Sequence, residues 1–152
     1  MSYTGAQGRE QLLNTVAAAI EQIGLALACV GAAYERVDEQ TAERLERELF
    51  LPVQRAYGRA QRTHSEFARR HGLAPRSFTA ASAGAPSRSV RDLLDGASDA
   101  VSAADTTLAT LQDSMLPVEV GDPELRSGLQ EVRLLLGELR GRVRELTRTL
   151  GR

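Results

Sequence analysis

The stretch LNTVAAAIEQIGLALACVGAAYERV, residues 13–37, decides the fold class. Its larger apolar residues follow one another at alternating intervals of three and four: Leu13, Val16, Ile20, Ile23, Leu27, Val30, Tyr34 and Val37. This spacing keeps one stripe of a helix against a partner. Alanine and glycine lie on both sides of the stripe, so that neighbouring helices can approach closely. We therefore predict that residues 8–37 form the most buried helix of an all-helical bundle.

Three further segments carry comparable apolar stripes. The stripe of residues 39–71 has a period near 3.6, and those of residues 88–116 and 123–150 alternate between intervals of four and three. Short connections between most of these segments favour antiparallel neighbours. The prediction is an all-α, up-and-down antiparallel four-helix bundle, coiled-coil-like in its packing, that forms a single domain of residues 1–152.

Helix boundaries follow from residues that start or interrupt helices. Asp38, either Ser87 or Ser89, and Asp122 can each accept hydrogen bonds from the free amide groups that open a helix. Pro52 lies inside the second segment, where a proline removes one backbone hydrogen bond and clashes with the preceding turn. We therefore expect the second helix to be kinked or broken there.

Residues 74–87 are rich in alanine, serine, glycine and proline, and we expect them to form a flexible loop. Phe78 is the exception in this stretch. Its large apolar ring could pin the loop to the bundle.

Composition limits the classes of protein to consider. The 152 residues are 42% hydrophobic and 26% charged, all 19 basic residues are arginine, and the net charge is −1. Nucleic-acid binding is not expected, because no aromatic residues are interleaved with the arginines. The single Cys29 excludes an internal disulfide framework. No signal peptide is visible, and the uncharged apolar run of residues 23–34 is shorter than the ~20 residues that span a bilayer. We expect a cytoplasmic protein without membrane contact.

The sign of the charge alternates along the chain. Residues 1–50 carry a net charge of −4, residues 51–76 carry +5, residues 77–124 carry −6 and residues 125–152 carry +4. In an up-and-down bundle, each helix would then lie beside helices of the opposite sign. This pattern predicts which helices are neighbours rather than how stable the bundle is.

Neither a metal site nor a cofactor is predicted. Di-metal helical bundles use inward-facing Glu-x-x-His pairs, but Gln61 precedes His64 at that spacing and Ala68 precedes His71. No His/Cys cluster has the spacing of a zinc site. Phosphate-binding and dinucleotide-binding loops are absent as well.

Four residues near Pro52 form the candidate ligand site: Tyr57, His64, Arg55 and Arg59. In this hypothesis they supply polar groups to a pocket between the helices, with His64 as a general base or ligand contact. The simpler interpretation is that the histidine rings lie half-solvated at the edge of the apolar stripe. The arginines would then form a solvated face that pairs with acids of the first and third helices.

The outer face of the first helix is unusually apolar, with Ala18, Leu25, Ala28, Cys29 and Ala32 away from the stripe. A bundle helix normally presents polar residues there. Either the loop of residues 74–87 or a second subunit must cover this face. We expect a homodimer or larger oligomer that packs through it.

The sequence therefore predicts a non-catalytic helical-bundle protein that mediates protein–protein interaction or self-assembly. The alternative is a small-molecule binder or enzyme with a pocket near Pro52. A third option is a secretion-linked protein, because Tyr34 and Asp38 have the Tyr-x-x-x-Asp spacing of type VII secretion substrates. This pattern lies at a helical turn, and no Trp-x-Gly turn accompanies it, so no family is assigned.

Overall fold

The computed structural model describes residues 5–79 and 81–150, and every regular element in these residues is helical. The elements are α1 (Gly5–Tyr34), α2 (Glu39–Leu45), the π-helical segment η1 (Glu46–Phe50), α3 (Leu51–Arg70), α4 (Val90–Asp113), the single-turn α5 (Leu116–Glu119) and α6 (Pro123–Leu150). The all-helical prediction is confirmed, and the predicted boundaries agree to within a few residues. Residues 1–4 and 151–152 of the predicted domain, and Ala80 of the predicted loop, lie outside the described residues.

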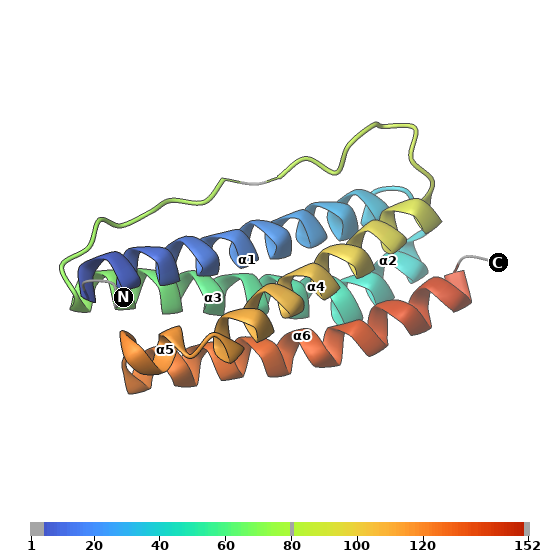
Figure 1. Ribbon diagram of the computed structural model, residues 1–152. Coiled ribbons are helices and arrows are strands. Elements are labelled where there is room, and N and C mark those ends of the chain that lie inside the picture. Colours follow the sequence, from blue (N-terminus) through green and yellow to red (C-terminus); the bar gives the residue numbers. More distant parts are fainter. Residues whose placement is uncertain (1–4, 80, 151–152) are drawn as a thin grey trace.

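The four long helices pack side by side, and each packed pair is antiparallel (Figure 1). Thr107 near the end of α4 donates to Oε1 of Gln22 on α1 at 2.9 Å, and Arg59 of α3 pairs with Glu131 of α6. The helices follow one another around the bundle in the order α1, α4, α6, α3. Consequently α3 and α4 run in the same direction at opposite corners, and the predicted up-and-down alternation is wrong for this step.

Residues 71–79 and 81–89, called the strap below, explain the difference. They carry the chain along the outside of α1, from the end of α3 at one end of the bundle to the start of α4 at the other (Figure 1). An extended chain covers about 3.3 Å per residue, and a helix rises only about 1.5 Å per residue. The strap is therefore long enough to return along the whole of α1, so α4 starts beside the end of α1.

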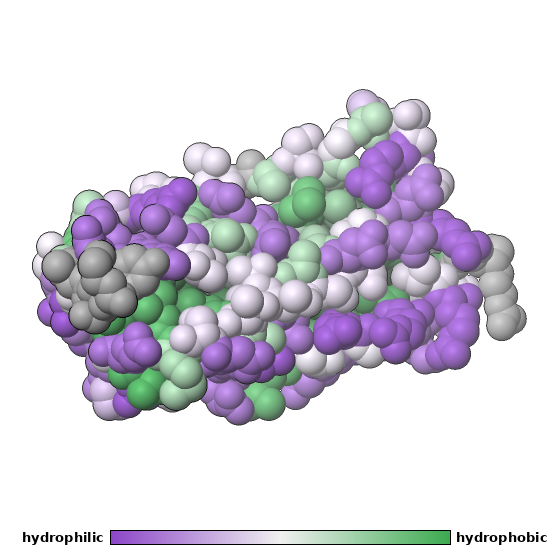
Figure 2. Space-filling model, in the orientation of Figure 1, coloured by the Kyte–Doolittle hydropathy of each residue, from purple (hydrophilic) through white to green (hydrophobic). Residues whose placement is uncertain are grey.

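The charge pattern fails as a guide to neighbours for the same reason. The acidic segments that contain α1 and α4 lie side by side, as do the basic segments that contain α3 and α6. Hydrophilic residues cover the C-terminal half of α6 (Figure 2). An exposed ion pair contributes only about 0–1 kcal/mol, whereas burying one leucine or valine side chain contributes about 1.5–3 kcal/mol. Apolar packing therefore outweighs the charge pattern.

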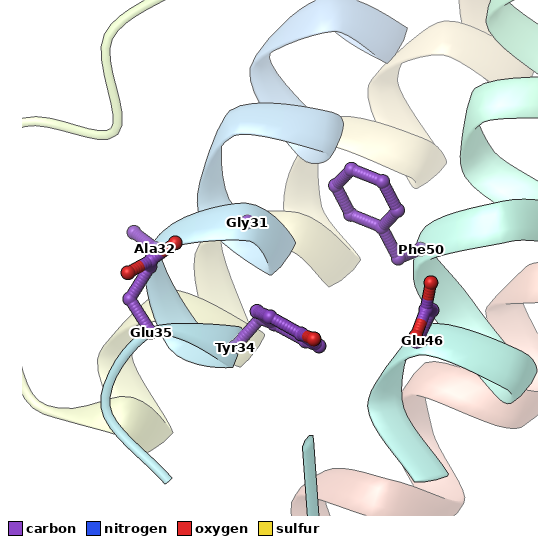
Figure 3. A pocket seen from close by; sticks show the side chains of 6 residues that line it. All are labelled: Gly31, Ala32, Tyr34, Glu35, Glu46 and Phe50. Atoms are coloured by element: carbon purple, nitrogen blue, oxygen red, sulfur yellow. The ribbon is translucent and has the colours of Figure 1, made fainter. Parts of the chain in front are cut away.

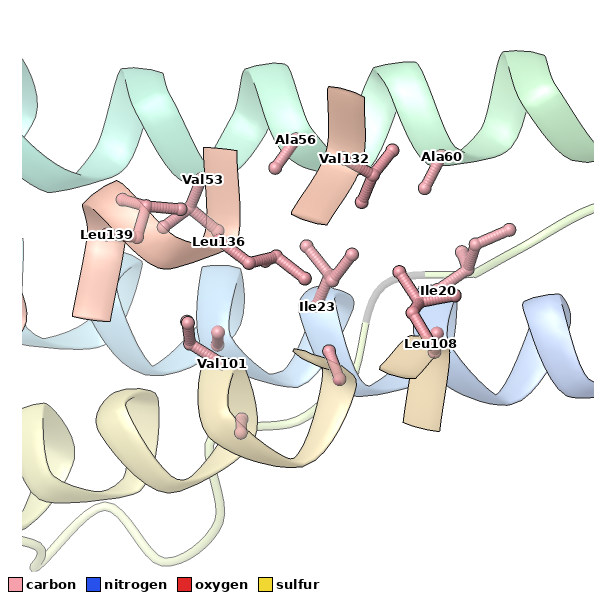
Figure 4. Packing of buried hydrophobic residues seen from close by; sticks show 14 of the residues in the cluster. Ile20, Ile23, Val53, Ala56, Ala60, Val101, Leu108, Val132, Leu136 and Leu139 are labelled. Atoms are coloured by element: carbon pink, nitrogen blue, oxygen red, sulfur yellow. The ribbon is translucent and has the colours of Figure 1, made fainter. Parts of the chain in front are cut away.

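The core contains side chains from all four long helices (Figure 4). Most residues of the predicted stripes are buried, and the fully buried side chains include Ile20, Ile23, Leu49, Val53, Leu94, Val101, Leu129 and Leu136. Two stripe residues near helix ends are exposed: Tyr34 retains 37% of its surface and Met115 retains 51%. The contact between α1 and α4 is the most extensive in the bundle.

The second helix passes Pro52 without a break. The π-helical segment η1 lies directly before Pro52, and the amide of Leu51 bonds to the carbonyl of Glu46, five residues back. This wider turn accommodates a residue that has no amide hydrogen and whose ring would crowd a normal turn. The predicted break is therefore absent and the helix is instead widened locally, while the kink stays a prediction.

Capping residues occupy the predicted positions. Oδ1 of Asp38 accepts from the amide of Thr41 at 2.7 Å, and Oγ of Ser89 accepts from the amide of Asp92 at 3.0 Å. Asp122 opens α6 by accepting from the amide of Leu125 at 2.8 Å. These bonds confirm that the short polar residues begin their helices.

Helix α1 is long and apolar enough to cross a membrane by length and composition alone, and 56% of its most apolar window is buried inside the bundle. A core helix of a globular bundle has the same character. The cytoplasmic location stays a prediction.

Candidate functional site

The four residues of the predicted ligand site lie on two different faces of α3. Tyr57 packs against α1, where a Cβ atom built on Gly24 would lie 3.2 Å from its Cε1. Arg59 faces α6, and its Nε donates to Oε2 of Glu131 at 2.8 Å. Exposed Arg55 lies on the same side, since its charge contributes to lowering the pKa of Glu131. His64 is buried near the other end of α3. The structure does not assemble these residues into one pocket.

Two interpretations of the basic and histidine residues need correction. The ion pair of Arg59 is with α6 rather than with the first or third predicted helix. His64 retains only 2% of its surface, so its ring is not half-solvated. His64 therefore lies on the face of α3 that points into the core, and not at the solvated edge of the helix.

His71 belongs to a polar cluster that joins the end of α3 to the start of α6. Its Nε2 lies 2.9 Å from Oδ2 of Asp122, and Arg70 makes two bonds of 2.8 Å to the same carboxylate. Burial alone would raise the pKa of Asp122, but the hydrogen bonds from Arg70, the amide of Leu125 and His71 lower it well below its usual value. The cluster connects two helix ends, which is a structural role.

His64 lines a small pocket beneath the start of the strap, called the His64 pocket below. Its ring meets the ring of Phe78 edge-on, with centroids 5.4 Å apart, so Phe78 does contact the bundle. Neither ring nitrogen reaches a partner within hydrogen-bonding geometry in the described residues. Burial lowers the pKa of His64 and the charge of Arg76 adds to this, although a hydrogen-bonding interaction with the backbone of Leu13, short of normal geometry, acts in the opposite direction.

The strap covers part of the apolar outer face of α1. Cys29 retains 1% of its surface because Gly96 and Arg88 pack over it; Nη1 of Arg88 lies 3.9 Å from its Sγ. Arg36 fixes the strap further by donating to the carbonyls of Pro86 and Arg88. Of the other predicted interface residues, Ala28 and Ala32 are half-buried, Ala18 is exposed and Leu25 retains 39% of its surface.

A larger opening, called the terminal groove below, separates the end of α1 from η1 (Figure 3). Its volume is about 530 Å³, and it is lined by Gly31, Ala32, Tyr34, Glu35, Glu46 and Phe50. Tyr34 and Phe50 project into the space between the two segments. The groove exists because Gly31 has no side chain to meet Phe50, whose ring would lie 3.6 Å from a Cβ atom built there.

The rim of the terminal groove carries two carboxylates, those of Glu35 and Glu46. Neither Glu35 nor Glu46 forms an ion pair within residues 5–79 and 81–150, whereas the nearby Glu48 is paired with Arg44 at 3.0 Å. Sequence reasoning missed this site because it treated Gly31 only as a small neighbour of the stripe. The available signal was Gly31 among the alanines of α1, together with Phe50 before Pro52.

In the described part of the chain, no group of three or more histidine, cysteine, aspartate or glutamate side chains could hold a metal ion. Comparison with known proteins finds no match to any family, curated protein or solved structure. The geometry of the two openings is therefore the basis for assigning a function.

Proposed function

We propose that this chain is a non-catalytic helical-bundle protein that binds another protein through the terminal groove. The partner segment that fits is an amphipathic helix with a bulky apolar side chain and flanking arginine or lysine residues. The observation that carries this proposal is an apolar groove of about 530 Å³ with two unpaired carboxylates on its rim.

The apolar part of the argument rests on the lining of the groove. Phe50 is only partly covered and Tyr34 retains 37% of its surface. Because Gly31 and Ala32 are small, they leave room between these two aromatic rings. Recognition of a helix commonly uses such a groove, into which the apolar face of the partner inserts. A side chain seated over Gly31 would cover aromatic surface that is otherwise in water.

The electrostatic part of the argument defines the partner's charge. Glu35, directly after α1, and Glu46 on η1 lie at the rim of the groove, and a basic residue beside the inserted side chain could pair with either. A symmetric dimer through this groove would bring the two acidic rims together, because a twofold interface uses the same patch on both copies. A basic segment from a different protein therefore fits better than a second copy.

The predicted self-assembly remains a secondary proposal for a different surface. It is supported by Leu25, which retains 39% of its surface beside half-buried Ala28 and Ala32. Light scattering of the wild type and of Leu25→Arg tests it, and a monomeric wild type would remove it. A cytoplasmic location, with α1 serving as a core helix, completes the proposal.

Site-specific photocrosslinking in the native cells tests the terminal groove. The photoreactive amino acid p-benzoylphenylalanine replaces Tyr34 in the groove, and in a control chain it replaces exposed Arg62 on α3. Crosslinked segments are identified by mass spectrometry. We expect a crosslink from position 34, and not from position 62, to a helical segment with arginine or lysine beside a bulky apolar residue.

A groove-filling variant provides the second measurement. Gly31→Leu places a side chain where a Cβ atom has 3.6 Å of clearance, so the bundle should fold while the groove is filled. The same change at Gly137, where nothing lies within 4 Å, is the matched control. Gly31→Leu should abolish the crosslink and Gly137→Leu should preserve it. A crosslink to a second copy, to an acidic segment, or one that survives Gly31→Leu would overturn the proposal.

A further inference from the structure

The His64 pocket is separate from the terminal groove and has a different chemical character. It lies between the N-terminal half of α1, the later turns of α3 and the first residues of the strap, and its volume is about 220 Å³. Leu13, Leu73 and Pro75 supply apolar wall, and Asn14 and Arg76 supply polar groups. This volume is below the ~300–1,000 Å³ of pockets for drug-sized ligands, so a smaller molecule fits it.

His64 gives the pocket an unexplained polar group. The side chain retains 2% of its surface, and its ring nitrogens make no hydrogen bond of normal geometry to the described residues; their only hydrogen-bonding interaction among these residues is with the backbone of Leu13. Buried polar groups in folded proteins are nearly always hydrogen-bonded, because leaving one unpaired carries its full desolvation penalty. A neutral imidazole offers one N–H donor and one acceptor nitrogen. At least one of these two ring sites is therefore available to a group bound in the pocket.

Arg76 stands at the same pocket with its donors incompletely used. Its closest polar contacts are long, at 3.5 Å to Oδ1 of Asn14 and 3.9 Å to Oε1 of Glu21. Its guanidinium group is near enough to His64 to act on the ring electrostatically. A planar guanidinium pairs with a carboxylate through two parallel hydrogen bonds, and this geometry favours a planar anion.

We propose that the His64 pocket binds a small organic carboxylate. Arg76 takes the carboxylate group, His64 donates its N–H to it, and Leu13, Leu73 and Pro75 contact the apolar body of the ligand. Glu10 also lines the pocket and is exposed, so its negative charge opposes an anion there. Removing this charge should therefore strengthen the binding of an anion.

Benzoate is the probe, and benzamide is its neutral counterpart of nearly the same shape. Binding is followed by NMR on the full-length protein, through the ring carbon-bound protons of His64 during titration. We expect saturable binding of benzoate with a millimolar dissociation constant, and binding of benzamide at least tenfold weaker. If binding of benzoate does not saturate, the proposal is overturned, and ordered water would be the remaining partner for the ring. Equal affinity for the two compounds would overturn the assignment of a carboxylate.

Three variants place the ligand within the pocket. Arg76→Gln should weaken benzoate binding at least fivefold, and Glu10→Gln should tighten it severalfold because the opposing charge is removed. Arg62→Gln is the control, since Arg62 is exposed on the same helix as His64 but does not line the pocket. Amide spectra confirm that each variant is folded. An unchanged affinity in Arg76→Gln, or a weaker one in Glu10→Gln, would overturn the proposed orientation.

Discussion

Gly128 on α6 provides a test of how closely α3 and α6 are packed. A Cβ atom built on Gly128 would lie 2.4 Å from Oγ1 and 2.8 Å from Cγ2 of Thr63 on α3. Thr63 cannot easily rotate away, because it is buried and its Oγ1 bonds to both the carbonyl and Nη1 of Arg59. Gly128→Ala therefore forces the two helices apart, and overpacking of this kind costs about 1–3 kcal/mol.

Gly137 on the same helix is the matched control, because nothing lies within 4 Å of a Cβ atom built there. Both substitutions gain the same helix propensity of about 0.5–1 kcal/mol. The difference between the two variants therefore isolates the clash. We expect Gly137→Ala to raise the free energy of unfolding and Gly128→Ala to lie about 1–3 kcal/mol below it. For a chain of this size, each 1 kcal/mol corresponds to about 2–4 °C in melting temperature.

Urea denaturation at one pH, with the slope checked for constancy, gives both free energies of unfolding. Adding Thr63→Ala to Gly128→Ala should recover part of the loss, because the clashing methyl and hydroxyl groups are gone. The double variant should then be more stable than the sum of the single changes by about 1 kcal/mol or more. Equal stability of Gly128→Ala and Gly137→Ala would refute the close approach of α3 and α6.

Three further predictions concern backbone strain and pH. Met115 has a left-handed backbone with φ 66°, so Met115→Gly should raise the unfolding free energy by about 0.5–1 kcal/mol in urea; a loss of stability would contradict this. The pKa of Asp122 is lower in the folded protein than in the unfolded chain, so its stabilisation is present above about pH 4 and is lost as the pH falls. Asp122→Asn should therefore show a smaller drop in urea midpoint than the wild type between about pH 6 and about pH 3, and parallel drops would exclude this role. The pKa of His64 is also lowered on folding, so His64→Leu should gain stability relative to the wild type as the pH falls through about 6.5, and a constant difference across that range would show that the ring does not titrate in this way.

Helix positions and caps could be predicted because they depend on local pattern. The stripe in residues 13–37 repeats within each helical turn. The caps at Asp38, Ser89 and Asp122 bond to amides only three residues further along the chain. The order of the helices around the bundle could not be predicted in the same way. All four stripes are apolar and interchangeable, so none of them specifies its neighbour.

The length of the strap was the missed topological signal. An up-and-down connection needs only a few residues, whereas the strap is long enough to follow α1 from one end to the other. Phe78 and Arg88 then hold it in place through His64 and Cys29. The terminal groove was missed because it depends on the absence of a side chain at Gly31. The spacing of apolar residues predicts which residues are buried, but it does not predict where a missing side chain leaves an opening.

The strap also divides the molecule into two antiparallel helical hairpins, α1 with α3 and α4 with α6, that share one core. Because nearly all apolar contact between these halves is made by helices, the peptide bonds of the strap need not be intact to keep the halves associated. A single proteolytic nick between residues 81 and 87 should leave two fragments that migrate together in a native gel and separate only in denaturant. The two halves could then be expressed as separate chains that recombine, which makes the protein a candidate split reporter.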